Sequence, residues 1–267
     1  MTFQEAHDFK AECDAIHALV SPLSDAQLDK PTLFKGWTIN NIIAHLHMWN
    51  IGANLTLSDP DKFAGFIGFA IENLGKGVGH IQMQNAYLDG LKGANLVKTW
   101  YDYYGPMSER FARANPEHRV KWAGPDMSVK SCIIARQMEH WAHAQAIFDV
   151  LGKSRINTDR LRNIAHIGVT TYGWSFRVNG RNAPNPKPYI RLVAPSGAVW
   201  VWNEQQDNNR IDGSAAEFSQ VVTQCRNIAD TGIKMTGQTA HEWMAIAQCF
   251  AGEAETPPAP NTRRKSL

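Results

Sequence analysis

The sequence has few cysteines and no paired cysteine motif. The 267-residue chain contains four of them, Cys13, Cys132, Cys225 and Cys249, which are far apart and form no CxxC pair. Such spacing does not indicate a disulfide framework. We therefore expect four separate buried or semi-buried thiols in a reducing compartment.

The sequence also lacks an excess of one charge and a long hydrophobic run. Its 27 Lys and Arg residues nearly balance 25 Asp and Glu residues, and the basic residues are scattered except for the last few, which gives no footprint for nucleic acid. No stretch of about 18 uncharged apolar residues could span a bilayer. The N-terminal segment carries acids and has no apolar core of a signal peptide. We expect a cytoplasmic protein without nucleic-acid or membrane partners, and we treat the C-terminal KSL, which permutes a peroxisomal SKL, as chance.

Apolar and aromatic residues are plentiful. Hydrophobic residues make up 43% of the chain, with nine Trp and eleven Phe, which is ample material for burial. The length exceeds that of a usual single core, so we favour two modest domains.

The first half shows four long helical patterns. Thr2 and Glu5 have capping-box spacing before the first pattern, Ser24 and Gln27 repeat it for a short turn, and Thr38 offers an N-cap for the second. The long patterns cover about residues 3–20, 39–57, 91–114 and 128–151, and a further helix starts at Asp59-Pro60. The glycines near residues 75–79 predict an irregular connection and are weak as a phosphate loop, because no strand precedes them. Burying four such stripes predicts a four-helix bundle over residues 1–153.

The pattern changes after Gly152. A helix capped by Asn157 is expected first, and residues 189–193 and 199–202 then alternate like the strands of a hairpin around a Pro-Ser-Gly turn. Two more capping boxes open helices, and they pair Ser214 with Glu217 and Thr239 with Glu242. We predict a small α+β domain over residues 154–253, a disordered tail over 254–267, and a fold class of α+β, mainly α.

Three residues have the pattern of a metal site. Glu139 and His143 lie four positions apart, so they project from one helix face about one turn apart. His45 lies in a different apolar-rich helix, where a buried imidazole needs a partner. Two imidazoles and a carboxylate leave a fourth position open, as in catalytic zinc sites. The spacing alone is weak, because a glutamate and a histidine four apart also form an ordinary helix-surface pair.

These residues carry a resemblance to a known family. Gly36-Trp37-Thr38, the following Ala44-His45-Leu46 and the segment MEHWAHAQ at residues 138–145 resemble the DinB-like metal-binding bundle of the mycothiol-dependent maleylpyruvate isomerase superfamily. The resemblance implies that His45, Glu139 and His143 are the metal ligands. The resemblance continues through residues 122–128, 135–136, 164–168 and 221–224. In these segments the chain is similar to an uncharacterised subgroup that has a sterol-carrier-like C-terminal domain. The chain departs from that subgroup at Ala144 and Cys225, where glycine and a basic residue are usual.

Other residues near these motifs have two interpretations each. Trp37, Trp49 and Trp141 are either an aromatic wall for a cofactor or substrate, or core packing. Arg136, three residues before Glu139, either pairs with a carboxylate or faces solvent.

Three further histidines are also considered. His166 is either a catalytic acid–base that approaches from the second domain or a structural histidine. His47 and His140 lie on other helix faces than the ligands and are not expected to bind the metal. The isomerases also use an arginine from the second domain, for which Arg177, Arg191 and Arg226 are candidates.

The resemblance implies a function. It implies a zinc-dependent enzyme that uses a low-molecular-weight thiol such as mycothiol, glutathione or bacillithiol, and that is an isomerase or transferase acting on a small electrophilic acid. One alternative is a metal-dependent hydrolase. Another is an acyl- or lipid-binding protein with a structural metal and a cavity in the second domain, whose lining would include Trp174, Phe176, Trp200 and Phe218. The expected partner is a small-molecule substrate, and a homodimer is left open.

Overall fold

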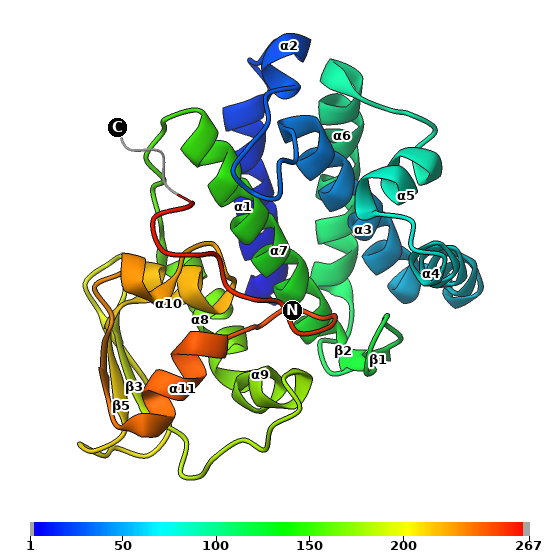
Figure 1. Ribbon diagram of the computed structural model, residues 1–267. Helices are drawn as coiled ribbons and strands as arrows, with labels where there is room; N and C mark the ends of the chain where they lie inside the picture. Colours follow the sequence, from blue (N-terminus) through cyan, green and yellow to red (C-terminus); the bar gives the residue numbers. More distant parts are fainter. Residues whose placement is uncertain (1–2, 264–267) are drawn as a thin grey trace. The chain divides into compact units, whose positions relative to one another are not determined.

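The computed structural model describes residues 3–263, and the chain divides into two compact units, residues 1–150 and 151–267. Figure 1 shows the first unit as mainly long helices and the second as short helices with a sheet. The division falls three residues before the boundary that the sequence predicts after residue 153. Independent folding of the two units stays a prediction.

The first unit is built around four long helices. They are α1 (Gln4–Val20), α3 (Ile39–Ser58), α6 (Gly93–Arg113) and α7 (Val129–Val150). Helices α1 and α3 each pack against both α6 and α7, so the four apolar stripes meet in one core. Phe9, Ile43, Trp100 and Ile133, one from each helix, are completely buried there. The predicted fold class, α+β and mainly α, is confirmed.

Local signals explain where these helices begin and end. Thr38 and Asn41 form the capping box that starts α3, and Ser24 and Gln27 form another at the short α2 (Asp25–Leu28). Gly152, with a φ of 62°, follows the end of α7 in the left-handed conformation that suits glycine. Of the predicted capping box of Thr2 and Glu5, Thr2 lies outside the described residues. Helix α1 starts after Phe3, which provides no side-chain cap.

Two helices and a small hairpin complete the first unit. Helix α4 (Pro60–Gly75) begins after Asp59 as expected, and β1 (Arg119–Val120) pairs antiparallel with β2 (Met127–Ser128) just before α7. Helix α5 (His80–Tyr87) was not predicted, because eight residues carry too little periodicity to outweigh the neighbouring glycines. It packs on α3, where the Gln84 side chain donates a hydrogen bond to the Asn41 carbonyl at 2.8 Å.

The second unit is a four-stranded sheet with helices packed against it. The strand order is β4 (Val199–Trp202), β3 (Tyr189–Val193), β5 (Arg210–Ser214) and β6 (Lys234–Thr236), and only the β3–β5 pair is parallel. The β3–β4 hairpin confirms the prediction, whereas β5 and β6 were missed because their short polar sequences show no clear alternation. Its helices are η1 (Asp159–Leu161), α8 (Arg162–Thr170), α9 (Tyr172–Val178), α10 (Ala215–Val222), η2 (Ile228–Asp230) and α11 (Gln238–Ile246).

Several predicted helix starts in the second unit were wrong in detail. Thr158 rather than Asn157 precedes η1, and Gly237 rather than Thr239 precedes α11. Gly237 has a φ of 87°, and a Cβ there would lie 2.3 Å from the Asn208 carbonyl oxygen, so backbone geometry sets this start. Ser214 does cap α10, but the Glu217 carboxylate accepts a hydrogen bond from the Gly232 amide instead of completing a capping box.

Residues 254–263 belong to the tail for which the sequence predicts disorder, which stays a prediction, and in the structure they make several hydrogen bonds to the second unit. The Gln224 amide donates to the Glu255 carbonyl at 3.0 Å, the Asn227 amide to the Pro258 carbonyl at 2.8 Å, and the Asn261 amide N–H donates to Asp230 at 2.9 Å. Side-chain amides thus satisfy a proline-rich backbone that cannot form regular ladders. Residues 264–267 lie outside the described part of the chain.

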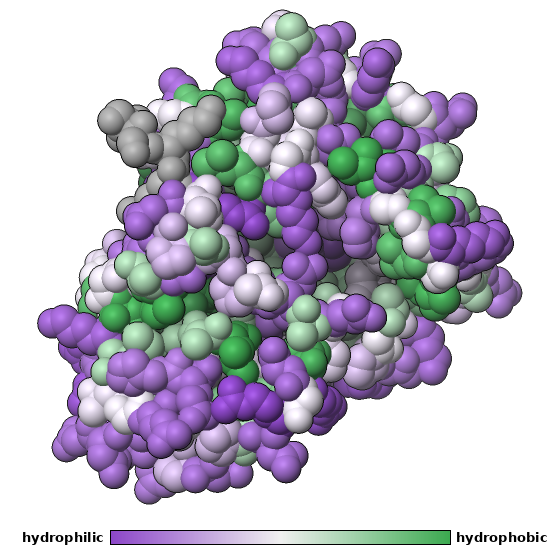
Figure 2. Space-filling view, in the orientation of Figure 1, coloured by the Kyte–Doolittle hydropathy of each residue, from purple (hydrophilic) through white to green (hydrophobic). Residues whose placement is uncertain are grey.

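The face of the molecule that Figure 2 shows is mostly hydrophilic, with smaller hydrophobic patches. Exposed apolar side chains include Ile71 and Leu74 on α4. Within residues 3–263, no helix has both the length and the apolar character needed to cross a membrane. Cys13, Cys132 and Cys249 are buried and Cys225 is partly exposed, and none forms a disulfide in the described part of the chain.

Candidate metal centre

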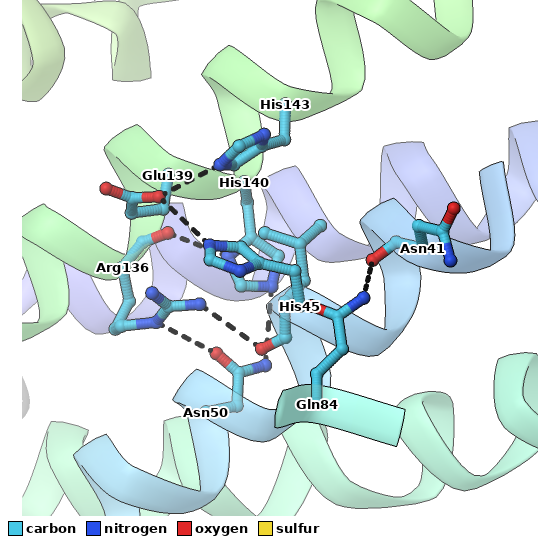
Figure 3. Close-up of polar contacts among 9 residues, drawn as sticks. Asn41, His45, Asn50, Gln84, Arg136, Glu139, His140 and His143 are labelled. Carbon is cyan, nitrogen blue, oxygen red and sulfur yellow. Dashed lines mark hydrogen bonds and ion pairs between the residues drawn. The ribbon is translucent and has the colours of Figure 1, made fainter. Parts of the chain in front are cut away.

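Two helices bring the three predicted ligands together. His45 lies in the second turn of α3, and Glu139 and His143 lie one turn apart on α7 (Figure 3). Nε2 of His143 is 3.2 Å from Oε2 of Glu139, and Nε2 of His45 is 3.7 Å from the same oxygen. Ligand atoms from all three residues lie within 4.8 Å of one another. Within residues 3–263, His45, Glu139 and His143 thus form a group that could hold a metal ion.

The spacing of these atoms fits a single ion. Zinc bonds to nitrogen and oxygen of about 2.0–2.2 Å in a tetrahedral arrangement place neighbouring ligand atoms about 3.3–3.6 Å apart. The observed separations of 3.2 and 3.7 Å lie on either side of that range. The ligand atoms of all three residues lie within 4.8 Å of one another, so one ion could bind all three after the two imidazoles move closer together.

The protonation states also suit a cation. Burial lowers the pKa of His45 to about 3, so its imidazole is neutral at physiological pH. Burial acts to raise the pKa of Glu139, but the adjacent imidazoles of His143 and His45 and the nearby Arg136 charge outweigh it and hold that pKa well below its usual range. A neutral His45 and an ionised Glu139 are thus in the forms that bind a metal cation. Nδ1 of His45 and Nδ1 of His143 are buried without a hydrogen-bond partner.

The site is recessed but not sealed. The side chains of His45, His143 and Glu139 are 11%, 13% and 23% exposed, respectively. A ligand from solution could therefore approach the fourth position while most of each protein ligand remains desolvated. Such a partly open site is typical of catalytic metals.

A short loop before α3 provides one wall of the site. Pro31 and Thr38 pair as an isolated β-bridge, and Thr32 donates to the Trp37 carbonyl at 2.8 Å, which closes the loop. The Trp37 ring stacks parallel to His143 at 5.9 Å and meets His45 edge-on at 5.3 Å. The structure therefore places Trp37 beside the proposed ligands.

The other two tryptophans differ in their positions. The Trp49 ring lies 6.3 Å from His45 and continues the aromatic surface toward Trp122, whose ring is 5.8 Å from Trp49. Trp141 is only 2% exposed and points to another face of α7 than Glu139 and His143. Its position fits the core-packing interpretation.

Two aromatic neighbours of the site were missed from the sequence. The Phe34 ring lies 4.9 Å from His143, and the His80 ring of α5 lies 6.0 Å from His45 and 6.2 Å from Trp37. Phe34 lies in the loop beside the Gly-Trp-Thr motif, so that proximity was a usable signal. His80 had no such signal, because α5 itself was not predicted.

A buried polar network lies beside the ligands. Arg136 is 2% exposed, and it donates through Nε to the Asn50 side-chain oxygen and through Nη2 to the Leu46 carbonyl, both at 3.2 Å. His140 lies in the same network and not in the ligand group: its Nδ1 is 2.7 Å from the Arg136 carbonyl, and its Nε2 is 3.3 Å from the Asn50 amide. Arg136 is therefore buried rather than facing solvent, and its side chain donates to two neutral oxygens rather than to a carboxylate.

The remaining candidate histidines lie elsewhere. The His47 ring is 5.3 Å from Tyr103 and, as expected, is not part of the ligand group. His166 is exposed on α8 in the second unit, where its Nδ1 accepts a hydrogen bond from the Trp202 indole at 3.3 Å. A catalytic role for His166 stays a prediction.

Comparison with known proteins gives three findings. Residues 9–148 match the family described as the mycothiol maleylpyruvate isomerase N-terminal domain. Uncharacterised proteins from two strains of Mycobacterium tuberculosis, CDC 1551 and H37Rv, are each 35% identical over 246 residues, which covers 92% of this chain and 94% of each relative. A crystal structure of the mycothiol-dependent maleylpyruvate isomerase covers 82% of this chain and 87% of its own with a TM-score of 0.50. At 16% identity, that likeness shows the fold alone.

Proposed function

The chain belongs to the family of the mycothiol maleylpyruvate isomerase N-terminal domain, and from this premise we propose that it is a metal- and thiol-dependent enzyme. The reaction that we propose is isomerisation of, or thiol transfer to, a small electrophilic acid. The supporting observation is the convergence of His45, Glu139 and His143 around one ion-sized position. Zinc is the proposed metal, and mycothiol, glutathione or another low-molecular-weight thiol the proposed cofactor.

The residues of the chain have distinct roles in this proposal. A bound divalent metal lowers the pKa of a thiol, so that nucleophilic thiolate exists at neutral pH. His45 and His143 would hold the metal through ring nitrogens, and Glu139 would hold it through its carboxylate. Trp37 and Trp49 form an apolar surface beside the ligands, which excludes water from that side. His166 stays a candidate acid–base, to be tested by substitution.

The thiol requirement can be tested on the cobalt-substituted protein. Adding the correct thiol should produce a strong thiolate-to-metal charge-transfer band, because sulfur binds the metal directly. The same addition to the Glu139→Ala variant should give no band, because that variant retains metal poorly. A screen of mycothiol, glutathione and bacillithiol against unsaturated acids and acyl thioesters then measures thiol-dependent turnover.

The same experiment separates the alternatives. If thiols leave the cobalt spectrum unchanged while an ester or amide is hydrolysed, the protein is a metal-dependent hydrolase. If neither occurs and apolar ligands bind tightly, it is a carrier protein. The carrier alternative gains no support from Phe176 and Phe218, which are completely buried in an aromatic core with Tyr172 and Trp243.

A further inference from the structure

We propose that Arg136 is a positioning residue that makes the metal centre select an anionic ligand, such as a thiolate or carboxylate, for its open position. The inference rests on the proposed metal site and adds to it the class of ligand that the site favours. It begins from the placement of Arg136, which is buried beside the ligands and yet makes its recorded hydrogen bonds to neutral groups.

The hydrogen bonds fix the guanidinium against α3. One acceptor is the carbonyl of Leu46, the residue directly after His45, and the other is the side chain of Asn50, one turn further on. Asn50 is completely buried and is held in turn by His140 (Figure 3). Arg136 therefore cannot leave the site without breaking contacts that also set the backbone beside a metal ligand.

The charge on Arg136 is not cancelled by an acceptor of its own. An arginine side chain stays protonated in proteins, so this is a permanent positive charge in the interior. Burial raises the pKa of Cys13 well above its usual value and that of Cys132 to about 12, so these neighbouring thiols are neutral. Glu139 is the carboxylate that interacts with Arg136 across one turn of α7.

A metal ion changes this balance. Glu139 can offset the charge of Arg136 or half of the charge of a divalent cation, but not both. With the ion bound, the ligand group and Arg136 together hold excess positive charge in a low-dielectric surrounding. Such a field opposes retention of the cation and favours an anion at the open position. The two effects have opposite signs, which distinguishes an electrostatic role from a merely structural one.

The test measures cobalt affinity and azide affinity of the full-length protein with three single substitutions. Arg136→Gln removes the charge, Arg136→Lys keeps the charge but not the two-point hydrogen bonding, and Lys130→Gln removes a partly exposed charge from the same helix as a control. Azide serves as a small anionic probe whose binding changes the visible cobalt spectrum. Circular dichroism confirms that each variant is folded.

We expect Arg136→Gln to bind azide about tenfold more weakly than wild type, because a buried charge acts through a lower effective dielectric than water. Its cobalt affinity should be equal to or higher than that of wild type. Arg136→Lys should keep azide affinity within about threefold, and Lys130→Gln should match wild type, because solvent and salt screen its charge.

The opposite pattern overturns the proposal. If Arg136→Gln loses cobalt affinity but binds azide normally once loaded, Arg136 only supports packing. If Arg136→Gln does not fold, the azide affinity of Arg136→Lys tests the proposal. That variant keeps the positive charge, so a large loss of its azide affinity would contradict the electrostatic role. Failure of wild-type protein to bind cobalt would instead refute the proposed function itself.

Discussion

Two histidines of α3, two positions apart, show how residue placement determines chemistry. His45 faces Glu139, whereas the His47 ring lies 5.3 Å from Tyr103. Residues two apart on a helix point about 200° apart, so one ion cannot use both. Burial lowers the pKa of His45 to about 3 and that of His47 to about 4, so both are neutral near pH 7 and burial alone does not distinguish them.

This difference gives a prediction for metal content. The His143→Ala variant should lose its metal during dialysis. Mutating a residue that only hydrogen-bonds to a ligand lowers metal affinity roughly 10–100-fold, and losing one of three ligands should lower it further. His47→Gln should retain about one ion per chain, since His47 is not a ligand. Elemental analysis of each purified variant measures both. Full metal content in a His45→Ala, His143→Ala double variant would disprove the site.

At the scale of elements, the start of α3 matters because it fixes the helix that carries His45. Thr38 and Asn41 form the capping box of α3, and Ser24 and Gln27 form the same motif on α2, which carries no ligand. The chain therefore contains a matched pair of caps, one that supports the site and one that does not.

Replacing Thr38 by Ala should lower the free energy of unfolding by about 1 kcal/mol, because the Asn41 amide at the start of α3 then loses its side-chain acceptor. It should also weaken metal binding, since fraying of the first turn of α3 disturbs the neighbouring Trp37 and His45. Ser24→Ala is the control and should leave metal affinity unchanged. Urea unfolding and a metal-competition titration measure the two effects, and equal metal affinities in both variants would contradict the coupling.

At the scale of the whole molecule, the three proposed ligands all lie in the first unit. A chain truncated after Ser154 should therefore stay helical and bind metal, while its turnover should be low if the second unit supplies a residue for the substrate. Circular dichroism and elemental analysis test the first statement, and the thiol-dependent assay tests the second. An unfolded truncated chain would mean that the two units share one core.

The sequence alone determined the parts that depend on local rules. Apolar spacing of 3.6 residues located the four bundle helices, the Thr38 cap located the start of α3, and four-residue spacing put Glu139 and His143 on one face. The resemblance supplied the pairing of His45 with that face. These features could be predicted because each depends on neighbours within a turn or two of helix, or on a motif that is short and continuous.

Only the tertiary structure decided the rest. It placed His80 beside His45 through a helix whose own periodicity is too weak to predict, and it paired β5 with β3, although β4 lies between them in the sequence. It also held residues 254–263 in place through side-chain amides from distant parts of the second unit. The same holds for Arg136, whose side-chain hydrogen-bond acceptors come from another helix. In each case the deciding interactions join residues far apart in the chain, and such contacts form only when the whole fold has brought them together.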